Sequence, residues 1–317
     1  MTAPENSRKT DVLIIGGGPA GMTSAIYCSR AGLSTLLLEG AVFGGQAAIA
    51  DRIDNYPGFP NGISGPELAG MMEQQARRFG AVLENDAVDA ISREGDGTFH
   101  VRGGNGEYIA RTIIIASGTE HRRLGIKGEE EMIGKGVSFC ATCDGVFFRG
   151  RKVAVFGGGD SAVKEALFLT KFASKVVVVH RRDKLRAEKV IQDEAFANQK
   201  ISFIWDTIPL EISGTDEVTG VSLKNVKSGE QSQLSVDGIF VFVGTRPRTE
   251  HLRGLIEMDE TGYIITDDRM ATSKGGIFAA GDVRRKILRQ VSTAVGDGAV
   301  AARSAEEYLS EHFPQAI

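Results

Sequence analysis

Short runs of branched apolar residues divide this chain into a repeating pattern. Val12–Ile15 and Val153–Phe156 are candidates for buried strands, and a glycine-rich turn follows each of them. Beyond each turn apolar residues recur with a period near 3.6, which predicts an amphipathic helix, and a second β-rich run follows at Thr35–Leu38 and at Val176–Val179. The pattern therefore predicts two units of strand, tight turn, helix and strand.

These two units match one another at a fixed offset. Gly16 corresponds to Gly157, and Val12 corresponds to Val153 at the same spacing. Thr112–Thr119 and Ile239–Thr245 add a further pair of buried-strand runs that both end in Gly-Thr. We expect two copies of one domain, with parallel sheets because strands and helices alternate.

The two copies do not simply follow one another. A third buried-strand run, Gly276–Asp282, precedes a helix-like stretch from Ser292 to Ser310, although the second copy already ends near Gly244. We therefore assign this C-terminal piece to the first domain. The prediction is a discontinuous first domain, residues 1–119 and 250–317, with a second domain inserted at 120–249. Residues 118–123 and 245–249 are then the candidate hinge strands.

The first glycine-rich turn, Gly16 to Gly21, has the pattern of a dinucleotide-binding motif. Its glycines admit a pyrophosphate, and the helix N-terminus supplies N–H groups and a partial positive charge. Glu39, directly after the second β-rich run, falls where a side chain reads the ribose, and a carboxylate there accepts hydroxyl hydrogen bonds and repels a 2′-phosphate. The site is predicted to bind FAD or NAD. Asp282 at a second strand end favours FAD, because it suits the ribityl chain or the pyrophosphate, and the dipole of the following helix would stabilise a reduced flavin.

The second turn carries the opposite charge at the equivalent place. His180 follows Ala162 at the same spacing at which Glu39 follows Gly21, and Arg181, Arg182 and Arg186 come after it. Guanidinium groups suit a phosphate dianion, so this site is predicted to bind NADPH. The alternative is an ordinary solvated run of charges, but the cluster falls where the motif geometry expects the ribose-reading residue.

A C-x-x-C pair lies just ahead of the second turn. Cys140 and Cys143 have the spacing of a disulfide oxidoreductase, and Asp144 beside them is a candidate general acid. Two nucleotides and one dithiol suggest an electron path from nicotinamide to flavin to disulfide. A zinc site is the alternative, but Cys28 is the only other cysteine and the histidines lack ligand spacing. We expect Cys28 to be a buried structural thiol.

Composition excludes several other classes. The net charge of −4 offers no basic footprint for nucleic acid and no polybasic membrane surface. No apolar run approaches the roughly 18 residues of a membrane span, and the first ten residues lack the apolar core of a signal peptide. Three cysteines are too few for a secreted disulfide framework, so we expect a cytoplasmic protein.

Seven segments together carry a resemblance to a known family. The chain resembles the low-molecular-weight, bacterial-type thioredoxin reductases, which belong to the flavoproteins with two dinucleotide-binding domains. The resemblance extends from about Asp11 to Leu309. It rests on GGGPAG (16–21), GGQ (44–46), CATCDG (140–145), GGGDSA (157–162), HRRDKLRAEK (180–189), FAAGD (278–282) and RQVSTAVGDG (289–298).

This resemblance implies the fold, the cofactors and most of the site. It implies an α/β protein with two Rossmann-like domains of the three-layer ββα type, non-covalent FAD, NADPH, a homodimer and a thioredoxin-like substrate protein. Cys143 would face the flavin, Cys140 would exchange with the substrate, and Asp144 matches the family's acid. The implied FAD contacts are Gly16, Gly18, Gly21, Glu39, Gly45, Gln46, Asn55, Val88, Asp282, Arg289, Gln290 and Val291. The implied NADPH contacts are Gly159, Asp160, Ser161, His180, Arg181, Arg182 and Arg186.

The chain departs from the family pattern at two places. Val146 replaces one aromatic residue of a docking element that continues with Phe147 and Phe148, and Arg248 stands near a position where most members carry Asn. For the two phenylalanines, core packing and partner docking are equally good interpretations.

One mechanistic inference depends on spacing. Cys143 lies a short distance before Gly157, so the disulfide and the nicotinamide belong to one domain while the flavin belongs to the other. If both use one face of the flavin they must take turns, and the two crossing strands would then act as a hinge.

Three other functions fit parts of the pattern. A flavoprotein that feeds a peroxidase would normally carry additional N-terminal redox modules, and a dithiol oxidase that uses oxygen would lack the arginine cluster. A non-enzymatic NADP(H) sensor would bind nucleotide without turnover.

Overall fold

The chain forms two structural units, one from the N-terminal and C-terminal parts of the sequence and the other from the part between them. The computed structural model describes residues 7–50, 53, 55–139 and 141–314. Unit 1 comprises Met1–Glu120 and Arg246–Ile317, and unit 2 comprises His121–Thr245. The boundaries fall within a few residues of those expected from the sequence. The two crossing segments, β7 (Thr119–His121) and β16 (Thr245–Pro247), pair as a two-stranded sheet.

Unit 1 is built on a seven-stranded sheet in the order β3-β2-β1-β6-β5-β4, with β17 also paired to β6. The centre is parallel, with Val12 of β1 opposite Thr35 of β2 and Thr112 of β6. Strands β4 and β5 run antiparallel and extend the sheet beyond the repeat. The strands are β1 (Arg8–Ile15), β2 (Thr35–Glu39), β3 (Val82–Asn85), β4 (Val88–Arg93), β5 (Phe99–Gly103), β6 (Glu107–Ile115) and β17 (Ile277–Ala279).

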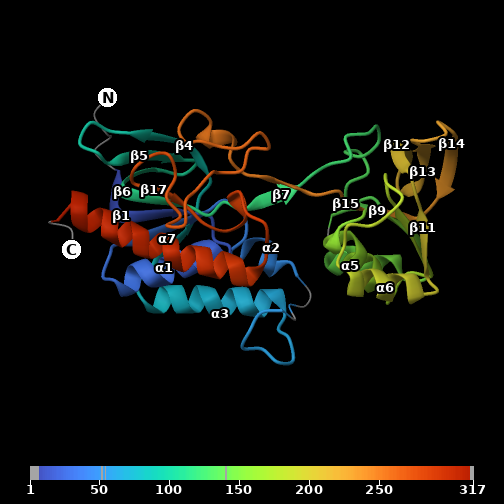
Figure 1. Ribbon diagram of the computed structural model, residues 1–317, viewed down its shortest axis with the longest axis horizontal. Coiled ribbons are helices and arrows are strands. Elements are labelled where there is room, and N and C mark those ends of the chain that lie inside the picture. The colour runs from blue at the N-terminus through green and yellow to red at the C-terminus, as the bar shows by residue number, and fades with distance from the viewer. Residues whose placement is uncertain (1–6, 51–52, 54, 140, 315–317) are drawn as a thin grey trace. The chain divides into compact units, whose positions relative to one another are not determined.

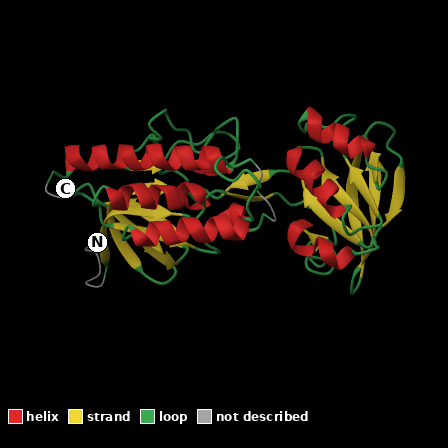
Figure 2. Ribbon diagram, turned by 90° about the horizontal axis from the view of Figure 1, so that it is seen from below, coloured by secondary structure: helices red, strands yellow, loops and turns green. Residues whose placement is uncertain are grey.

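The alternation of side chains along β1 gives unit 1 two cores. Val12 and Ile14 point to one face, where the helices α1 (Pro19–Arg30), α3 (Gly65–Arg78) and α7 (Val291–His312) lie side by side (Figures 1 and 2). Leu13 and Ile15 point to the other face and pack with residues of β5 and of the segment 252–264. Because both faces are covered, the parallel strands are continuous apolar runs, as the sequence shows.

Unit 2 repeats this plan around a five-stranded parallel sheet in the order β11-β10-β9-β15-β8. Helices α5 (Asp160–Leu169) and α6 (Lys189–Ala197) belong to this unit. The strands of the sheet are β8 (Val137–Ser138), β9 (Lys152–Gly157), β10 (Lys175–Val179), β11 (Ile201–Ile204) and β15 (Gly238–Phe242).

A third layer covers the other face of this sheet. Val153 and Val155 of β9 pack with α5, whereas Ala154 and Phe156 pack with an antiparallel sheet. That sheet consists of β12 (Thr207–Gly214), β13 (Val218–Asn225) and β14 (Gln231–Ser235) (Figure 1). The α/β fold with two three-layer units therefore agrees with the prediction. The expected parallel strands form the five-stranded sheet of unit 2 and the centre of the sheet of unit 1, and β4, β5 and β12–β14 add antiparallel pairs. None of the helices in the described ranges is long and apolar enough to cross a membrane.

Candidate functional site

The first glycine-rich turn joins β1 to α1, and a side chain would have a different effect at Gly16, at Gly18 and at Gly21. Gly16 has φ +108°, and a Cβ there would lie 2.3 Å from the carbonyl oxygen of Ala116. A Cβ at Gly21 would lie 1.9 Å from the carbonyl oxygen of Gly16, so only glycine lets α1 start this close to β1. A Cβ at Gly18 would meet no atom within 4 Å. The turn thus packs tightly against neighbouring backbone at Gly16 and Gly21 and is open at Gly18, where a pyrophosphate can approach.

Glu39 is held at the end of β2 by this same turn. Its Oε2 accepts a hydrogen bond from the Gly17 N–H at 2.6 Å, and its Oε1 accepts one from the Ala41 N–H at 2.8 Å. The side chain is buried. A carboxylate oxygen has more than one lone pair, so the group can still accept hydrogen bonds from ribose hydroxyls in a fixed direction.

The Gly-Gly-Gln segment after β2 closes against the turn. The Gly44 N–H donates to the carbonyl of Gly17 at 2.7 Å, and a Cβ at Gly45, which has φ +53°, would lie 3.3 Å from the Cα of Gly18. Helix α2 (Gly45–Ala48) starts here, and the side-chain amide of Gln46 lies 3.4 Å from the carbonyl oxygen of Thr119. Three segments predicted to contact FAD are therefore adjacent.

Asp282, from the C-terminal part of the chain, lies near the start of α1. Gly281, with φ +79°, packs so closely on α1 that a Cβ would lie 2.8 Å from the Cβ of Ala20. The Oδ1 atom of Asp282 is buried and has no hydrogen-bond partner among the described residues. Burial raises the pKa of Asp282, and the charges of Lys286 and Arg289 oppose that rise. A buried acceptor without a donor can accept a hydrogen bond from a bound group such as a cofactor hydroxyl.

A neighbouring carboxylate fixes the backbone at Asp282. Asp297 on α7 accepts hydrogen bonds from the Gly281 N–H at 3.0 Å, from Arg284 at 2.9 Å and from Lys286 at 2.6 Å. Both cationic side chains are largely buried in this cluster. Asp297 thus supplies one negative charge to two buried cations, and it was not among the site residues predicted from the sequence.

The start of α7 carries three more of the predicted FAD contacts. Gln290 caps the helix together with Thr293, and the side-chain oxygen of Gln290 accepts a hydrogen bond from Asn55 at 2.8 Å. The Arg289 Nε donates to the carbonyl of Asp282 at 3.3 Å. Val291 is the first residue of α7, so the positive end of a long helix dipole lies beside Asp282.

Val88 lies by the ribose-reading end of the cluster. Val88 is the first residue of β4 and directly follows Ala87. A Cβ added at Gly40 would lie 2.9 Å from the Cβ of Ala87, so the two segments are in close contact. Gly40 in turn follows Glu39. The residues of unit 1 therefore offer an open pyrophosphate turn, a ribose-reading carboxylate and a buried unsatisfied acceptor along one extended path, which fits FAD.

The second glycine-rich turn joins β9 to α5 in unit 2. Gly157 has φ +151°, and a Cβ there would lie 2.3 Å from the carbonyl oxygen of Phe242. Gly159, like Gly18, has no atom within 4 Å of a Cβ position, and it caps the N-terminus of α5. Ala162 replaces the third glycine. This turn is likewise open at Gly159, and Ser161 on the first turn of the helix is exposed.

His180 lies under this turn rather than in solvent. Its ring is buried, and a Cβ at Gly158 would lie 2.4 Å from two ring atoms. Burial lowers the pKa of His180, and the charges of Arg186, Arg181 and Arg182 lower it further. The imidazole is therefore neutral at neutral pH, and its buried Nε2 has no partner among the described residues.

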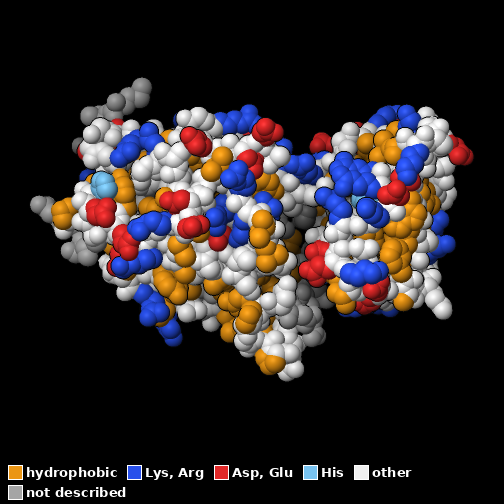
Figure 3. All heavy atoms as spheres, viewed as in Figure 1, with side chains coloured by type: hydrophobic (Ala, Val, Ile, Leu, Met, Phe, Trp, Pro, Cys, Tyr) orange, Lys and Arg blue, Asp and Glu red, His pale blue; other side chains and the backbone are white. Residues whose placement is uncertain are grey.

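The arginines that surround His180 are available to a ligand. Arg181, Arg182 and Arg186 are exposed, and their guanidinium groups form no hydrogen bond or ion pair with any described residue. Basic side chains gather on the visible face of unit 2 (Figure 3). Asp160, a predicted nucleotide contact, instead accepts a hydrogen bond from the Glu188 N–H at 2.7 Å and so closes the loop that carries the arginines.

The C-x-x-C segment packs on the helix that follows this turn. Cys140 lies outside the described residues, as does the side chain of Cys143. The short helix α4 (Ala141–Asp144) contacts α5, and a Cβ at Gly145 would lie 3.1 Å from Leu169. Asp144 is half-buried. The dithiol segment and the second nucleotide turn are therefore parts of one unit, joined through α5.

The two phenylalanines after the dithiol differ completely in environment. Phe148 is buried, and its ring meets Phe240 edge-on at a centroid distance of 5.2 Å. Phe147 is 73% exposed, and Val146 beside it is 46% exposed. Core packing is thus the correct interpretation for Phe148, and Phe147 is the one available to a partner.

The remaining predictions concern Cys28, metal ligands and Arg248. Cys28 is buried in α1, and burial raises the pKa of its thiol to about 12. Among the described residues no group of His, Cys, Asp or Glu side chains is arranged to hold a metal ion. Arg248 lies 3.9 Å from Glu120, and both residues belong to unit 1.

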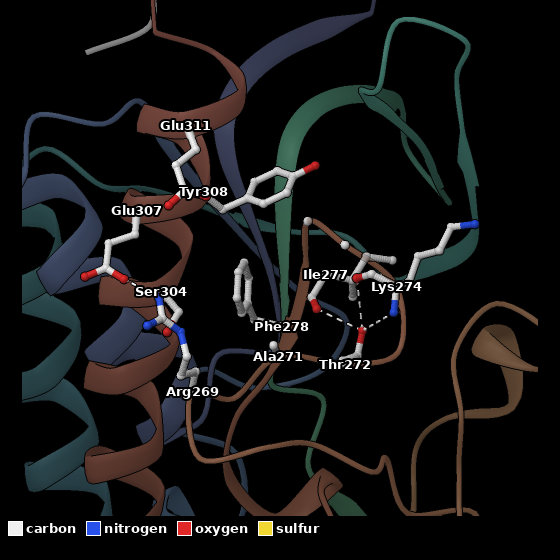
Figure 4. A pocket seen from close by; sticks show the side chains of 12 residues that line it. Arg269, Ala271, Thr272, Lys274, Ile277, Phe278, Ser304, Glu307, Tyr308 and Glu311 are labelled. Atoms are coloured by element: carbon white, nitrogen blue, oxygen red, sulfur yellow. Dashed lines mark hydrogen bonds and ion pairs between the residues drawn. The ribbon is translucent and has the colours of Figure 1, made fainter.

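A separate cavity of about 180 Å³ lies in unit 1 between the C-terminal half of α7 and the loop before β17 (Figure 4). Phe278 and Tyr308 line it, and Glu307 forms ion pairs with Arg269 and Arg303 at its edge. None of the residues predicted to contact FAD lines it. The cavity is therefore not part of the predicted FAD site.

Comparisons with known proteins match almost the whole chain. A family model described as pyridine nucleotide-disulphide oxidoreductase matches residues 10–298. The thioredoxin reductase of Bacillus subtilis is 49% identical over 304 residues, which cover 95% of each chain. That of Listeria innocua is 50% identical over 302 residues, covering 95% of this chain and 94% of the relative. The crystal structure of Lactococcus lactis thioredoxin reductase matches with a TM-score of 0.92 and 49% identity, covering 95% of this chain and 99% of the other.

Proposed function

Because the chain belongs to the pyridine nucleotide-disulphide oxidoreductase family, we propose that it is an NADPH-dependent thioredoxin reductase. The net reaction consumes NADPH, a proton and a protein disulfide, and yields NADP⁺ and a protein dithiol. The observation that carries the proposal is the presence in one unit of a C-x-x-C segment and of three arginines whose guanidinium groups have no hydrogen bond or ion pair with the described residues.

Unit 1 is the proposed FAD domain. The open turn at Gly16, Gly18 and Gly21 would receive the pyrophosphate, Glu39 the adenosine ribose, and the buried Oδ1 of Asp282 a ribityl hydroxyl. Bound FAD supplies the two-electron exchange between a nicotinamide and a disulfide. The other proposed contacts are Gly45, Gln46, Asn55, Val88, Arg289, Gln290 and Val291.

Unit 2 is the proposed NADPH domain. The open turn at Gly159, with Asp160 and Ser161 beside it, would receive the pyrophosphate at the N-terminus of α5. Arg181, Arg182 and Arg186 would bind the 2′-phosphate, and a neutral His180 would close the ribose pocket beneath them.

The dithiol would carry out the exchange with the substrate. The thiolate of Cys140 attacks one sulfur of the substrate disulfide, which forms a mixed disulfide and releases the other substrate sulfur as a thiolate. Cys143 then attacks the Cys140 sulfur, so the substrate leaves as a dithiol and Cys140–Cys143 remains as a disulfide. Asp144 would donate and accept the protons that accompany these steps.

The assembly and partner belong to the same proposal. We infer a homodimer in the cytoplasm that acts on a thioredoxin-like protein, with β7 and β16 as the hinge that lets the dithiol and the nicotinamide take turns at the flavin.

A coupled assay tests the function. The purified protein with bound FAD should oxidise NADPH in the presence of oxidised thioredoxin, and two thiols should form for each NADPH consumed. Binding of NADPH without turnover would instead identify a sensor, and thiol formation driven equally well by NADH would contradict the assignment of the arginine cluster.

A further inference from the structure

The loop after β10 mixes positive and negative side chains, but they are not paired with one another. The guanidinium groups of Arg181, Arg182 and Arg186 have no hydrogen bond or ion pair with any described residue, although Asp183 lies between them in the sequence. The Asp183 carboxylate instead lies 3.3 Å from the Nζ of Lys227. Lys227 is a distant residue, from the turn between β13 and β14.

A second carboxylate is bound by the same lysine. The Nζ of Lys227 lies 2.9 Å from the carboxylate of Asp206, which is only 17% exposed. Asp206 adjoins the arginine loop, because its N–H donates to the carbonyl of Arg182 at 3.2 Å. Without Lys227, two carboxylates would lie beside the guanidinium groups with no cation of their own.

The position of Lys227 is fixed by its turn. The side-chain oxygen of Asn225 accepts hydrogen bonds from the N–H groups of Lys227 and Ser228, both at 2.9 Å. The Val226 N–H donates to the carbonyl of Asp206 at 2.6 Å, which ties this turn to the arginine loop. These contacts fix the backbone at Lys227 close to the two carboxylates.

We propose that Lys227 is a specificity-determining residue, which holds Asp183 and Asp206 away from the arginines and so keeps the guanidinium groups available for the 2′-phosphate of NADPH. This inference rests on the proposed function. Exposed ion pairs such as these contribute little to folding stability. At a phosphate site the same carboxylates matter more, because carboxylate and phosphate compete for the same guanidinium fork.

Calorimetric titration of the oxidised, FAD-loaded full-length protein with NADP⁺ and with NAD⁺ tests the proposal. In Lys227→Gln the dissociation constant of NADP⁺ should rise roughly three- to tenfold, as expected for one lost charge near a surface site, and that of NAD⁺ should change by less than about twofold. Lys127→Gln is the matched control, since Lys127 is an exposed lysine of unit 2 paired with Glu211 at 2.7 Å. It should leave both constants unchanged.

Removal of the carboxylates should make the lysine unnecessary. Asp206 has φ +51°, which asparagine also adopts readily, so Asp206→Asn fits the backbone. In the triple variant Asp183→Asn, Asp206→Asn, Lys227→Gln, NADP⁺ binding should return at least to the level of the unmodified protein.

Three results would overturn the inference alone: unchanged NADP⁺ binding in Lys227→Gln, equal losses for NADP⁺ and NAD⁺, or no recovery in the triple variant. In the first and third results unaltered NAD⁺ binding shows that the variant is folded, and in the second an unchanged circular dichroism spectrum shows it. Equal affinity of the unmodified protein for the two nucleotides would overturn the proposed NADPH site, and this inference with it.

Discussion

Replacement of Phe147 and of Phe148 by alanine should have opposite consequences. Phe148 is buried against Phe240, and loss of such a ring costs about 3–5 kcal/mol of unfolding free energy. Phe147 is 73% exposed, so its removal should change the unfolding free energy by less than about 0.5 kcal/mol. Comparison of the two variants thus distinguishes an effect on folding stability from an effect on the docking of the substrate protein.

The size of the docking effect follows from the exposed surface. A phenylalanine can bury roughly 150–250 Å², so on the order of 100 Å² of Phe147 is available to a partner. At about 25 cal/mol per Å² this area corresponds to about 2.5 kcal/mol. Costs of ordering reduce the observable part to roughly 1–2 kcal/mol, or about a 5- to 30-fold rise in KM for thioredoxin.

Steady-state kinetics with two substrates measure this effect. Phe147→Ala should raise the KM for oxidised thioredoxin and leave the reduction of a small aromatic disulfide unchanged, while urea unfolding shows wild-type stability. Val190→Ala is the control, because Val190 is 71% exposed on α6 of the same unit and should alter neither quantity. An unchanged KM for thioredoxin in Phe147→Ala would refute the docking argument.

Three further predictions concern the nucleotide, the buried thiol and the acid. Arg181→Ala combined with Arg182→Ala should weaken NADPH binding at least roughly a hundredfold and NADH binding little, and raised salt should weaken NADPH selectively; equal losses for both nucleotides would refute the assignment. The native, reduced protein should show two thiols that react rapidly with a disulfide reagent, with Cys28 reacting only after unfolding. Since the pKa of Cys28 is raised to about 12, the folded state keeps a proton that the unfolded state loses, so stability should fall as the pH rises above about 9, and Cys28→Ala should remove that slope in unfolding experiments. Asp144→Asn should slow dithiol turnover by roughly 10²–10⁴-fold without a comparable loss in the rate of flavin reduction, which stopped-flow absorbance resolves; an unchanged turnover would exclude Asp144 as the acid.

The parallel cores were predictable because their pattern is local. Strands such as Val12–Ile15 and Val153–Phe156 are buried on both faces, so each appears as a continuous apolar run before a glycine turn. The second β layer of unit 2 was implied by the family resemblance alone and not by the local pattern, because β12 and β14 are mostly half-buried or exposed and their apolar residues show no clear period.

The site was predictable only where one segment carries the whole signal. Glu39 and His180 follow from a fixed spacing to their glycine turns, and both lie at the ends of the expected strands. The roles of Asp297 and Lys227 depend on contacts between segments far apart in the sequence, so no local pattern indicates them. Phe147 and Phe148 could not be separated because adjacent residues share every sequence feature except the direction of the side chain.

Stopped-flow absorbance of the flavin in Cys143→Ser, together with a thioredoxin reduction assay, tests the proposed electron path most directly. NADPH should still bleach the flavin at a rate near that of the unmodified protein, since hydride transfer does not require the dithiol, and thioredoxin reduction should be lost. Loss of flavin bleaching in this variant, or full retention of thioredoxin reduction, would contradict the order of nicotinamide, flavin and disulfide.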